Sequence, residues 1–467
     1  MVQSTHARTL CHLQHLRHSF AQQSGLPFAD LLPEDTAELL GPSTEPIYTP
    51  SVTTAMFLSQ VLDSDGSCQQ AVTRLQAWRA ASGQPPCSES TGAYCKARQR
   101  LSEESLRSLA LRCGQTLSKQ AMATDWVWKG RRVQVVDGST VTAADTPANQ
   151  KEYPQPDGQK PGLGFPMLRL VVLFCLATGS VLKAVFSPYS GKGTGEISLL
   201  RLAWDNLEAT DVLLGDSIYC SYFEIALLKQ RGVEVVLHKH QSRRSDFRTG
   251  TRLGRHDHVV VWKKPAMPKW LDEATYQSLA ATLTIREVRV SVSQAGFRVR
   301  RFEIITTLLD ASDVSALELG KLYRRRWFAE LNLRSLKDSL GMDQLRCKTP
   351  GMVRKELWAY LLSYNLVRGS MAQAASMCDT TPQRLSFKGA VQTLLSFGPV
   401  LSLGGGCSRN ECLERFWYAI GSHRVADRPD RAEPRAVKRR KKSYPSLNEP
   451  RNLARKRLYE TNPGIGK

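Results

Sequence analysis

The sequence predicts an α/β fold, in which a mixed sheet is flanked by helical regions on both sides along the chain. Three observations lead to this prediction. Good helix formers separated by short breaks recur through the first 130 residues. From Arg132 the apolar residues alternate with polar ones or form short runs, as they do in strands. From Ser315 the helical pattern returns.

The strand-rich part has an informative order. Three strand patterns come first, and helix and strand patterns then alternate: strands 133–136, 167–176 and 180–187, helix 196–207, strand 212–214, helix 223–230 and strand 233–237. Consecutive strands pair antiparallel, whereas strands separated by helices pair parallel. This order fits a mixed sheet of the ribonuclease H kind, whereas periodicity alone gives only the α/β class.

The charge of the chain is its most unusual property. The 467 residues include 64 Lys and Arg against 43 Asp and Glu, which gives a formal net charge of +21 and a pI of about 9.7. Such a surplus indicates a polyanionic partner, either nucleic acid or an anionic membrane surface. No run of 18 apolar residues occurs, and no secretory signal precedes the fold, so we expect DNA rather than a membrane.

We divide the chain into six expected segments by these patterns. They are a helical N-terminal DNA-binding region at 1–130, the first part of the core at 131–241, a β-rich insertion at 242–312, a core helix at 313–345, a helical C-terminal region at 346–423 and a basic tail at 424–467. The tail holds 14 Lys and Arg against 5 Asp and Glu, with five consecutive cations at 438–442, so we expect it to be disordered until it meets a polyanion.

The N-terminal region contains its own basic cluster. Lys96, Arg98 and Arg100 follow Tyr94 just ahead of a helix pattern. A small helical DNA-binding unit and a solvated basic helix end are equally good interpretations of this cluster.

The helix pattern after the insertion carries one coherent polar stripe. Tyr323, Arg326, Glu330, Arg334 and Lys337 lie at offsets of about four and seven residues from Glu330, so a helix places them on one face. An ion-pair ladder on a solvated surface is one interpretation. A single carboxylate among cations also suits a phosphate bridged by a metal ion, and the opposite face of this helix is apolar.

Two further carboxylates follow predicted strands. Asp137 comes after the strand at 133–136, and Asp216 comes after the buried strand at 212–214. Taken singly, each is typical of a turn or helix-cap aspartate. Their occurrence together with Glu330 favours a shared site.

The spacing Tyr-x2-Arg-x3-Glu-x6-Lys at Tyr323, Arg326, Glu330 and Lys337 resembles the signature of DDE transposases of bacterial insertion sequences. Asp137 in Val-Val-Asp-Gly-Ser and Asp216 in Leu-Gly-Asp-Ser-Ile-Tyr resemble the first two acidic residues of that family. The resemblance spans about 132–337. It implies a ribonuclease H-like core, a β-rich insertion between the second and third acids, and phosphate contacts by Tyr323, Arg326 and Lys337 at the element's ends.

This resemblance also implies the chemistry. Three carboxylates, Asp137, Asp216 and Glu330, are expected to be catalytic and to hold Mg²⁺ or Mn²⁺, with two ions, because oxygen donors suit these cations and two metals can stabilise an in-line displacement at phosphorus. The glycine-rich stretch 190–195 lacks the order of a phosphate loop, so no nucleotide cofactor is expected.

The insertion supplies further candidates for DNA contact. Related transposases that form a hairpin at the DNA end stack a flipped base on a tryptophan of this insertion, and Trp262 is the candidate here. A packing aromatic is the alternative. Arg243 and Arg244 belong to a second basic cluster, and Arg334 extends the helix stripe toward the DNA.

We therefore expect a DNA transposase that binds double-stranded element ends, cleaves DNA and joins 3′-hydroxyl ends to target DNA, as a homodimer in the DNA complex. Two alternatives remain open: a ribonuclease H-fold nuclease that cuts without joining, and an inactive DNA-binding regulator derived from a transposase. The expected location is the bacterial cytoplasm, on the nucleoid.

Overall fold

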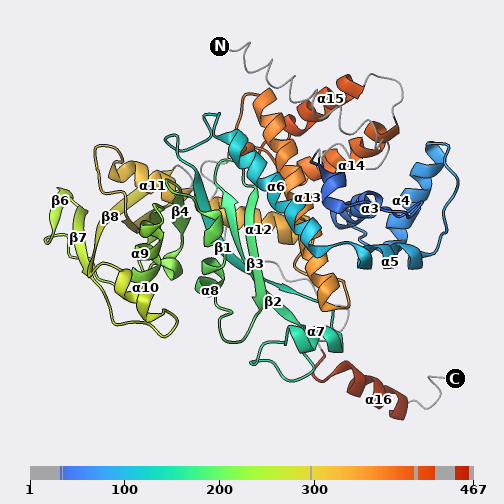
Figure 1. The fold of residues 1–467 in the computed structure, drawn as a ribbon, viewed down its shortest axis with the longest axis horizontal. Coiled ribbons are helices and arrows are strands. Elements are labelled where there is room, and N and C mark those ends of the chain that lie inside the picture. The colour runs from blue at the N-terminus through green and yellow to red at the C-terminus, as the bar shows by residue number, and fades with distance from the viewer. Residues whose placement is uncertain (1–31, 34, 295–296, 404–408, 426–446, 462–467) are drawn as a thin grey trace.

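The computed structural model describes residues 32–33, 35–294, 297–403, 409–425 and 447–461. The expectations for residues 1–31 and for the five-cation run at 438–442 lie outside the described residues. The expectation that the tail is disordered is wrong for residues Arg451–Thr461, which form a helix. Figure 1 shows a long molecule with the insertion strands at one end and the N-terminal helices α3 to α5 near the other.

Nine strands of the described residues form one sheet in the order β3-β2-β1-β4-β5-β9-β8-β7-β6. Their bounds are β1 Val133–Thr142, β2 Met167–Cys175, β3 Val181–Pro188, β4 Val212–Gly215, β5 Glu234–His238, β6 Thr251–Gly254, β7 Asp257–Lys263, β8 Thr282–Gln294 and β9 Phe297–Thr306. β1 to β3 pair antiparallel, and β4 and β5 run parallel to β1. This 3-2-1-4-5 order with these directions is the ribonuclease H-like arrangement, and it confirms the predicted α/β class.

The two faces of the sheet are both buried, because the strands carry apolar residues on both sides. Val135 and Leu214 belong to the main core, which the helices α6 (Glu103–Ala121), α11 (Ala316–Arg324), α12 (Trp327–Arg334) and α13 (Pro350–Met377) cover. Val136 and Leu213 point to the other face, which α8 (Glu196–Arg201) and α9 (Tyr222–Gln230) cover. Near-continuous apolar strands such as β4 are therefore explained by burial on both faces.

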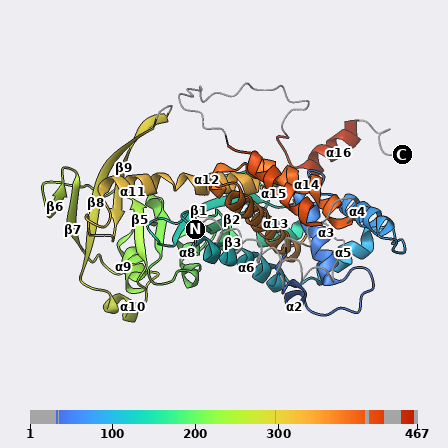
Figure 2. The same ribbon diagram turned by 90° about the horizontal axis from the view of Figure 1, so that it is seen from above.

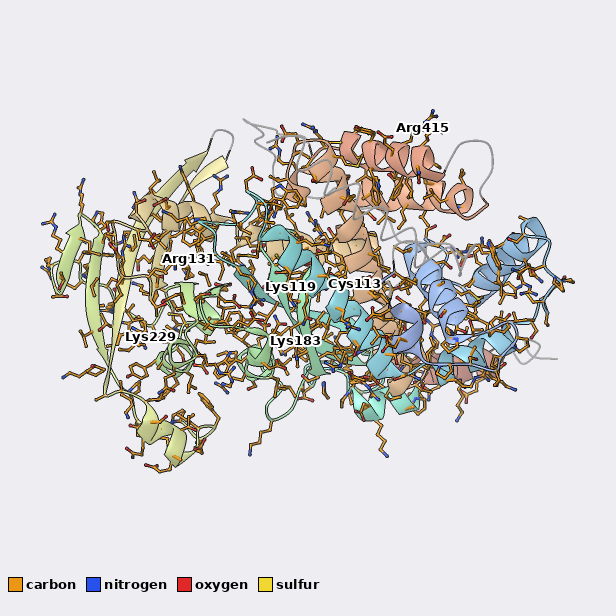
Figure 3. All side chains as sticks on the ribbon, turned by 45° about the horizontal axis from the view of Figure 1, so that its top comes forward. Cys113, Lys119, Arg131, Lys183, Lys229 and Arg415 are labelled. Atoms are coloured by element: carbon orange, nitrogen blue, oxygen red, sulfur yellow. The ribbon has the colours of Figure 1, made fainter. Side chains whose placement is uncertain are left out.

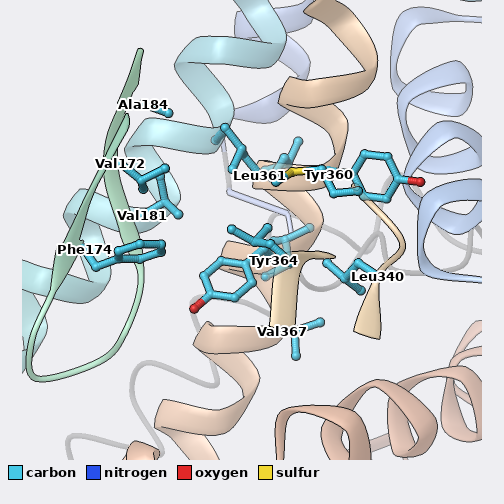
Figure 4. Packing of buried hydrophobic residues seen from close by; sticks show 14 of the residues in the cluster. Val172, Phe174, Val181, Ala184, Leu340, Tyr360, Leu361, Tyr364 and Val367 are labelled. Carbon is cyan, nitrogen blue, oxygen red and sulfur yellow. The ribbon is translucent and has the colours of Figure 1, made fainter. Parts of the chain in front are cut away.

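Helix α13 is the central support of the main core. Tyr364 and Leu361 of this helix face Phe174 and Val181 of the sheet (Figure 4). On its other side α13 packs against α3 (Pro50–Leu62), while α4 (Cys68–Ala81) and α5 (Thr91–Arg100) lie beyond it.

The remaining helices are α2 (Thr36–Leu40), α7 (Pro147–Glu152), α10 (Glu273–Ser278), α14 (Phe387–Leu403), α15 (Arg409–Ser422) and α16 (Arg451–Thr461).

A buried side-chain amide forms hydrogen bonds with the backbone of the edge strand β3. Asn365 of α13 accepts a hydrogen bond from the Val181 N–H at 2.7 Å and donates to the carbonyl oxygens of Val181 and Ala110 at 2.9 and 2.7 Å. Gly114 of α6 permits this approach, since a Cβ there would lie 1.9 Å from the Val181 oxygen. Lys183 of β3, labelled in Figure 3, has a mostly covered side chain and pairs with Asp205 at 2.8 Å.

The insertion strands continue the core sheet. β9 pairs antiparallel with β5, from Val236 opposite Thr306 to His238 opposite Ile304, and β8, β7 and β6 follow in order. In Figure 2 these strands lie at one end of the molecule, and the β8–β9 pair extends beyond the level of α11. The β-rich segment expected from the sequence is therefore an extension of the core sheet.

The helix expected from Ser315 to about Leu340 is interrupted. α11 ends at Arg324 and α12 begins at Trp327, while the N–H groups of Arg326 and Phe328 bond three residues back. After Arg334 the chain forms a π-helix, Ser335–Ser339. The single continuous helix of the sequence prediction is wrong, although the turn at 325–326 keeps the helical path.

No helix among the described residues is long and apolar enough to span a membrane. The nine cysteines in the described part of the chain are free thiols.

Candidate active site

Asp137 and Asp216 lie on neighbouring parallel strands. Val135 of β1 is opposite Leu214 of β4, and continuing this register by two residues brings Asp137 beside Asp216. Asp216 caps the short 3₁₀ helix Ser217–Tyr219 (η3) and accepts a hydrogen bond from the Ser217 N–H. Asp216 directly follows β4, whereas Asp137 lies in the middle of β1, which continues to Thr142, so the expectation that Asp137 follows a strand ending at residue 136 is wrong.

The side chain of Glu330 reaches the cleft with Asp137 and Asp216 from the helical layer. It lies in the first turn of α12, which packs against β1, and it forms an ion pair with Arg326 four residues earlier. The three carboxylates of Asp137, Asp216 and Glu330 thus come from two strands and a helix that are separated by up to 193 positions in the sequence.

These three side chains line one open cleft of about 400 Å³. Its other lining residues come from β1 and from the helix stripe: Gly138, Arg326, Leu333, Arg334, Lys337 and Asp338. Carboxylates on the sheet side therefore face cations on the helix side, which is an arrangement suited to a phosphate and a divalent cation together.

The surroundings of Asp137 disfavour the charged form of its carboxyl group. Burial raises the pKa of Asp137 to about 6, and the negative charges of Glu330 and Glu196 add to the rise. The Arg326 guanidinium and the Gly138 N–H oppose it. Crowded carboxylates with a raised pKa are typical of sites that bind cations.

The three carboxylates fit a hard cation by their donor chemistry. All offer oxygen, and Mg²⁺ takes a few carboxylates together with water and substrate phosphate. Among the described residues no three His, Cys, Asp or Glu side chains converge on one point, and Glu330 is engaged by Arg326. Holding one cation with all three carboxylates would require Glu330 to release Arg326.

The cations of the helix stripe differ in their surroundings. Arg334 is largely exposed and pairs with Asp338 at 3.4 Å. Lys337 donates a hydrogen bond to the Thr140 carbonyl of β1 at 3.0 Å. Arg334 is therefore open to a ligand, whereas Lys337 also ties the π-helix to the strand that carries Asp137.

Tyr323 is buried rather than open to the cleft. It is 5% exposed, its ring packs against Phe302 and His238, and burial raises its pKa further above the usual value. Its hydroxyl group stays protonated, with the Arg326 guanidinium close by. Tyr323 accordingly supports Arg326 in this structure.

The candidate DNA-contact residues of the insertion, Trp262, Arg243 and Arg244, do not line the cleft. Arg243 stacks on the Trp262 ring, with 3.7 Å between the guanidinium carbon and the ring centroid, and the indole N–H donates to Glu287 at 3.2 Å. Arg244 is exposed. Trp262 is thus partly covered by packing, and stacking with a base requires Arg243 to move.

The three cations of the N-terminal basic cluster differ in how far they are buried. Lys96 and Arg100 are exposed, whereas Arg98 is buried between the Phe57 and Tyr94 rings and donates to Gln60 at 3.2 Å. Arg98 therefore belongs to the N-terminal core, and the pattern of the sequence alone did not distinguish it from its neighbours.

Two residues at the site were not selected from the sequence. Glu196, the first residue of α8, lies against Gly138, and Tyr219 of η3 is 2% exposed with its hydroxyl 3.5 Å from a Glu196 oxygen. The only sequence signal was an acid at the start of a helix, which normally indicates helix-dipole stabilisation.

The sheet order and this cleft define a protein with a ribonuclease H-like core and an acidic cleft. The family model described as "Transposase DDE domain" matches residues 128–366, just over half of the chain. The chain belongs to this transposase family.

Two known proteins show the extent of the similarity. The chain is 28% identical over 369 residues to the transposase InsG for insertion sequence element IS4 from Escherichia coli (strain K12), and the match covers 76% of this chain and 78% of that protein. A cryo-EM structure of the piggyBac transposase synaptic complex with hairpin DNA aligns over 81% of this chain and 77% of its own, with a TM-score of 0.42 and 9% identity.

Proposed function

We propose that this chain cleaves DNA at the ends of a mobile element by metal-assisted hydrolysis and joins the 3′-hydroxyl ends to target DNA. The observation that carries the proposal is the cleft in which Asp137, Asp216 and Glu330 face Arg326, Arg334 and Lys337. Membership of the transposase family and the net charge of +21 support DNA as the substrate.

Each group has a role in this proposal. Asp137, Asp216 and Glu330 would hold two Mg²⁺ or Mn²⁺ ions, which supply stabilisation of the attacking and leaving oxygens. Arg326 and Lys337 bind phosphate oxygens of the element end and orient the strand, with Tyr323 supporting Arg326 from behind. Arg334 extends this contact along the DNA backbone.

The remaining segments have subsidiary roles in the proposal. The N-terminal region, with Lys96 and Arg100 exposed, and the insertion, with Trp262, Arg243 and Arg244, contact the element end. The C-terminal region and its basic tail add contacts to the DNA backbone. Two ends must be held at once, so the active form is a homodimer on DNA, acting on the nucleoid in the bacterial cytoplasm.

The test is a strand-transfer assay with double-stranded element-end DNA and Mg²⁺. Asp137→Ala, Asp216→Ala and Glu330→Gln should each lower cleavage by at least about 100-fold while leaving DNA binding within a few-fold of the wild type. Asp205→Asn is the matched control, because Asp205 is an exposed carboxylate that pairs with Lys183 outside the cleft.

The strand-transfer assay also distinguishes the two alternative functions, a nuclease and a DNA-binding regulator. Cleavage without joining would identify a nuclease, and DNA binding without either reaction would identify a regulator. Near-normal cleavage by any of the three cleft variants would contradict the assignment of that carboxylate.

A further inference from the structure

A fourth carboxylate stands directly behind the cleft. Glu196 begins α8, the helix between β3 and β4, and its carboxyl group lies on the backbone of Gly138, the residue after Asp137. A Cβ at Gly138 would lie 2.4 Å from Cδ and 2.6 and 2.8 Å from the two oxygens of Glu196. Glycine at 138 is therefore a condition for bringing this carboxylate so close to β1.

The contacts of Glu196 leave much of its acceptor capacity unused. Arg169 of β2 donates to Oε1 at 3.4 Å, and the Tyr219 hydroxyl donates to Oε2 at 3.5 Å. Both distances are at the long end for hydrogen bonds, and a carboxylate can accept about four. A carboxylate that served only as a structural anchor would be expected to have shorter bonds.

The Tyr219 side chain links Glu196 to the other acids. It follows Asp216 by three positions, is 2% exposed, and experiences the negative charges of Glu196, Asp137 and Asp216, which raise its pKa beyond the effect of burial. The buried hydroxyl group is therefore a permanent donor among three carboxylates. This places Glu196 in the same electrostatic environment as the two aspartates.

We propose that Glu196 is a positioning residue of the metal centre, holding Asp137 in place through Gly138 and accepting hydrogen bonds from water on the bound cation. The inference rests on the proposed function, since it assumes a cation at Asp137 and Asp216. Mg²⁺ and Mn²⁺ keep several water ligands, and acceptors in the next layer orient them. The charge of Glu196, and not only its packing, is required for this role.

The experiment measures Mn²⁺ binding to the full-length protein by the loss of the free-ion EPR signal, without DNA and without turnover. Glu196→Gln keeps the size of the side chain and its contact with Gly138 but removes the charge. It should weaken Mn²⁺ binding about 10- to 100-fold. Glu196→Asp keeps the charge and should stay within about threefold of the wild type, and Asp205→Asn should leave the affinity unchanged.

The outcomes separate this inference from the proposed function. Mn²⁺ affinity within twofold of the wild type for E196Q, together with a large loss for Asp137→Asn, would overturn the role of Glu196 and leave the metal centre intact. An equal loss in E196Q and E196D would show that side-chain length and not charge matters, and would also overturn it. Unchanged binding in Asp137→Asn and Asp216→Asn would instead contradict the proposed function itself.

Discussion

At the scale of single residues, Asp137 carries a charge that its surroundings in the folded protein disfavour. Its pKa is raised to about 6 in the folded protein from 3.8, so the folded state binds this proton more tightly than the unfolded chain does. The metal-free protein is therefore destabilised by the charge of Asp137 above pH 6, and this penalty disappears as the pH falls toward 4.

We predict that Asp137→Asn stabilises the metal-free protein while abolishing cleavage. The variant removes the penalty of the buried charge, which corresponds to about 1–2 kcal/mol after allowance for partial solvent screening. Thermal melting in EDTA should show a higher melting temperature for the variant at pH 7.5 and little difference near pH 4.5. A lower melting temperature at pH 7.5 would contradict the raised pKa.

A second residue-scale prediction concerns Lys337. Lys337→Ala should weaken binding to element-end DNA and reduce the slope of log K against log salt concentration by about 0.9, the value for one phosphate contact. Lys183→Ala, which removes a cation outside the cleft, is the control. Filter binding or fluorescence anisotropy over a salt series measures the slope, and an unchanged slope for Lys337→Ala would remove this lysine from the DNA contact.

At the scale of elements, the sequence predicted most strands and their order because burial leaves a readable alternation, as in β1 and β4. It did not predict the break between α11 and α12, since Arg325 and Arg326 are ordinary helix residues and tertiary packing decides their geometry. Asp137 and Asp216 were selected because they follow predicted strands, Glu330 because of its place in the helix stripe, and all three through the resemblance to DDE transposases. Glu196 was missed, because its partner Gly138 is 58 positions away and only the fold brings them together.

One buried ion pair joins the insertion to the start of α11, the helix that precedes α12 and its candidate site residues. Arg286 of β8 is fully buried, pairs with Asp257 of β7 through two hydrogen bonds of 2.8 and 2.6 Å, and donates to the Val314 carbonyl at 2.6 Å. Val314 lies just before α11, whose first turn closes with a capping box of Ser315 and Glu318.

We predict that Asp257→Asn destabilises the protein by about 3–5 kcal/mol, because it leaves the Arg286 charge buried without its partner. Hydrogen exchange should increase in β8 and at the start of α11. Glu303→Gln is the comparison, since Glu303 is more exposed and pairs with Lys239 and Arg289, so it should cost less. Equal effects of the two variants would show that burial of the pair does not control this junction.

At the scale of the whole molecule, the net charge of +21 is distributed unevenly. Part of it borders the cleft at Arg326, Arg334 and Lys337, and 14 Lys and Arg belong to residues 424–467. The sequence alone establishes the tail's composition, whereas the fold was needed to separate Arg98, which is buried, from cations that remain available to DNA.

We predict that replacing the five cations at 438–442 by glutamine lowers DNA affinity equally for element-end and unrelated sequences. The salt slope should fall by up to about 4.5, since backbone contacts carry no sequence information. Lys229→Gln, on α9 away from the cleft, is the control. A loss confined to element-end DNA would instead assign sequence recognition to this segment.

The continuous sheet has a mechanical consequence. β7 is joined to β8, β8 to β9, β9 to β5, and β5 to the strand before Asp216, by backbone pairing, with a register shift between β8 and β9 after Val292. The outer strands are therefore coupled to the core by backbone hydrogen bonds. A displacement of β7, the strand that carries Trp262, passes through four strand pairings before it reaches β4, the strand before Asp216.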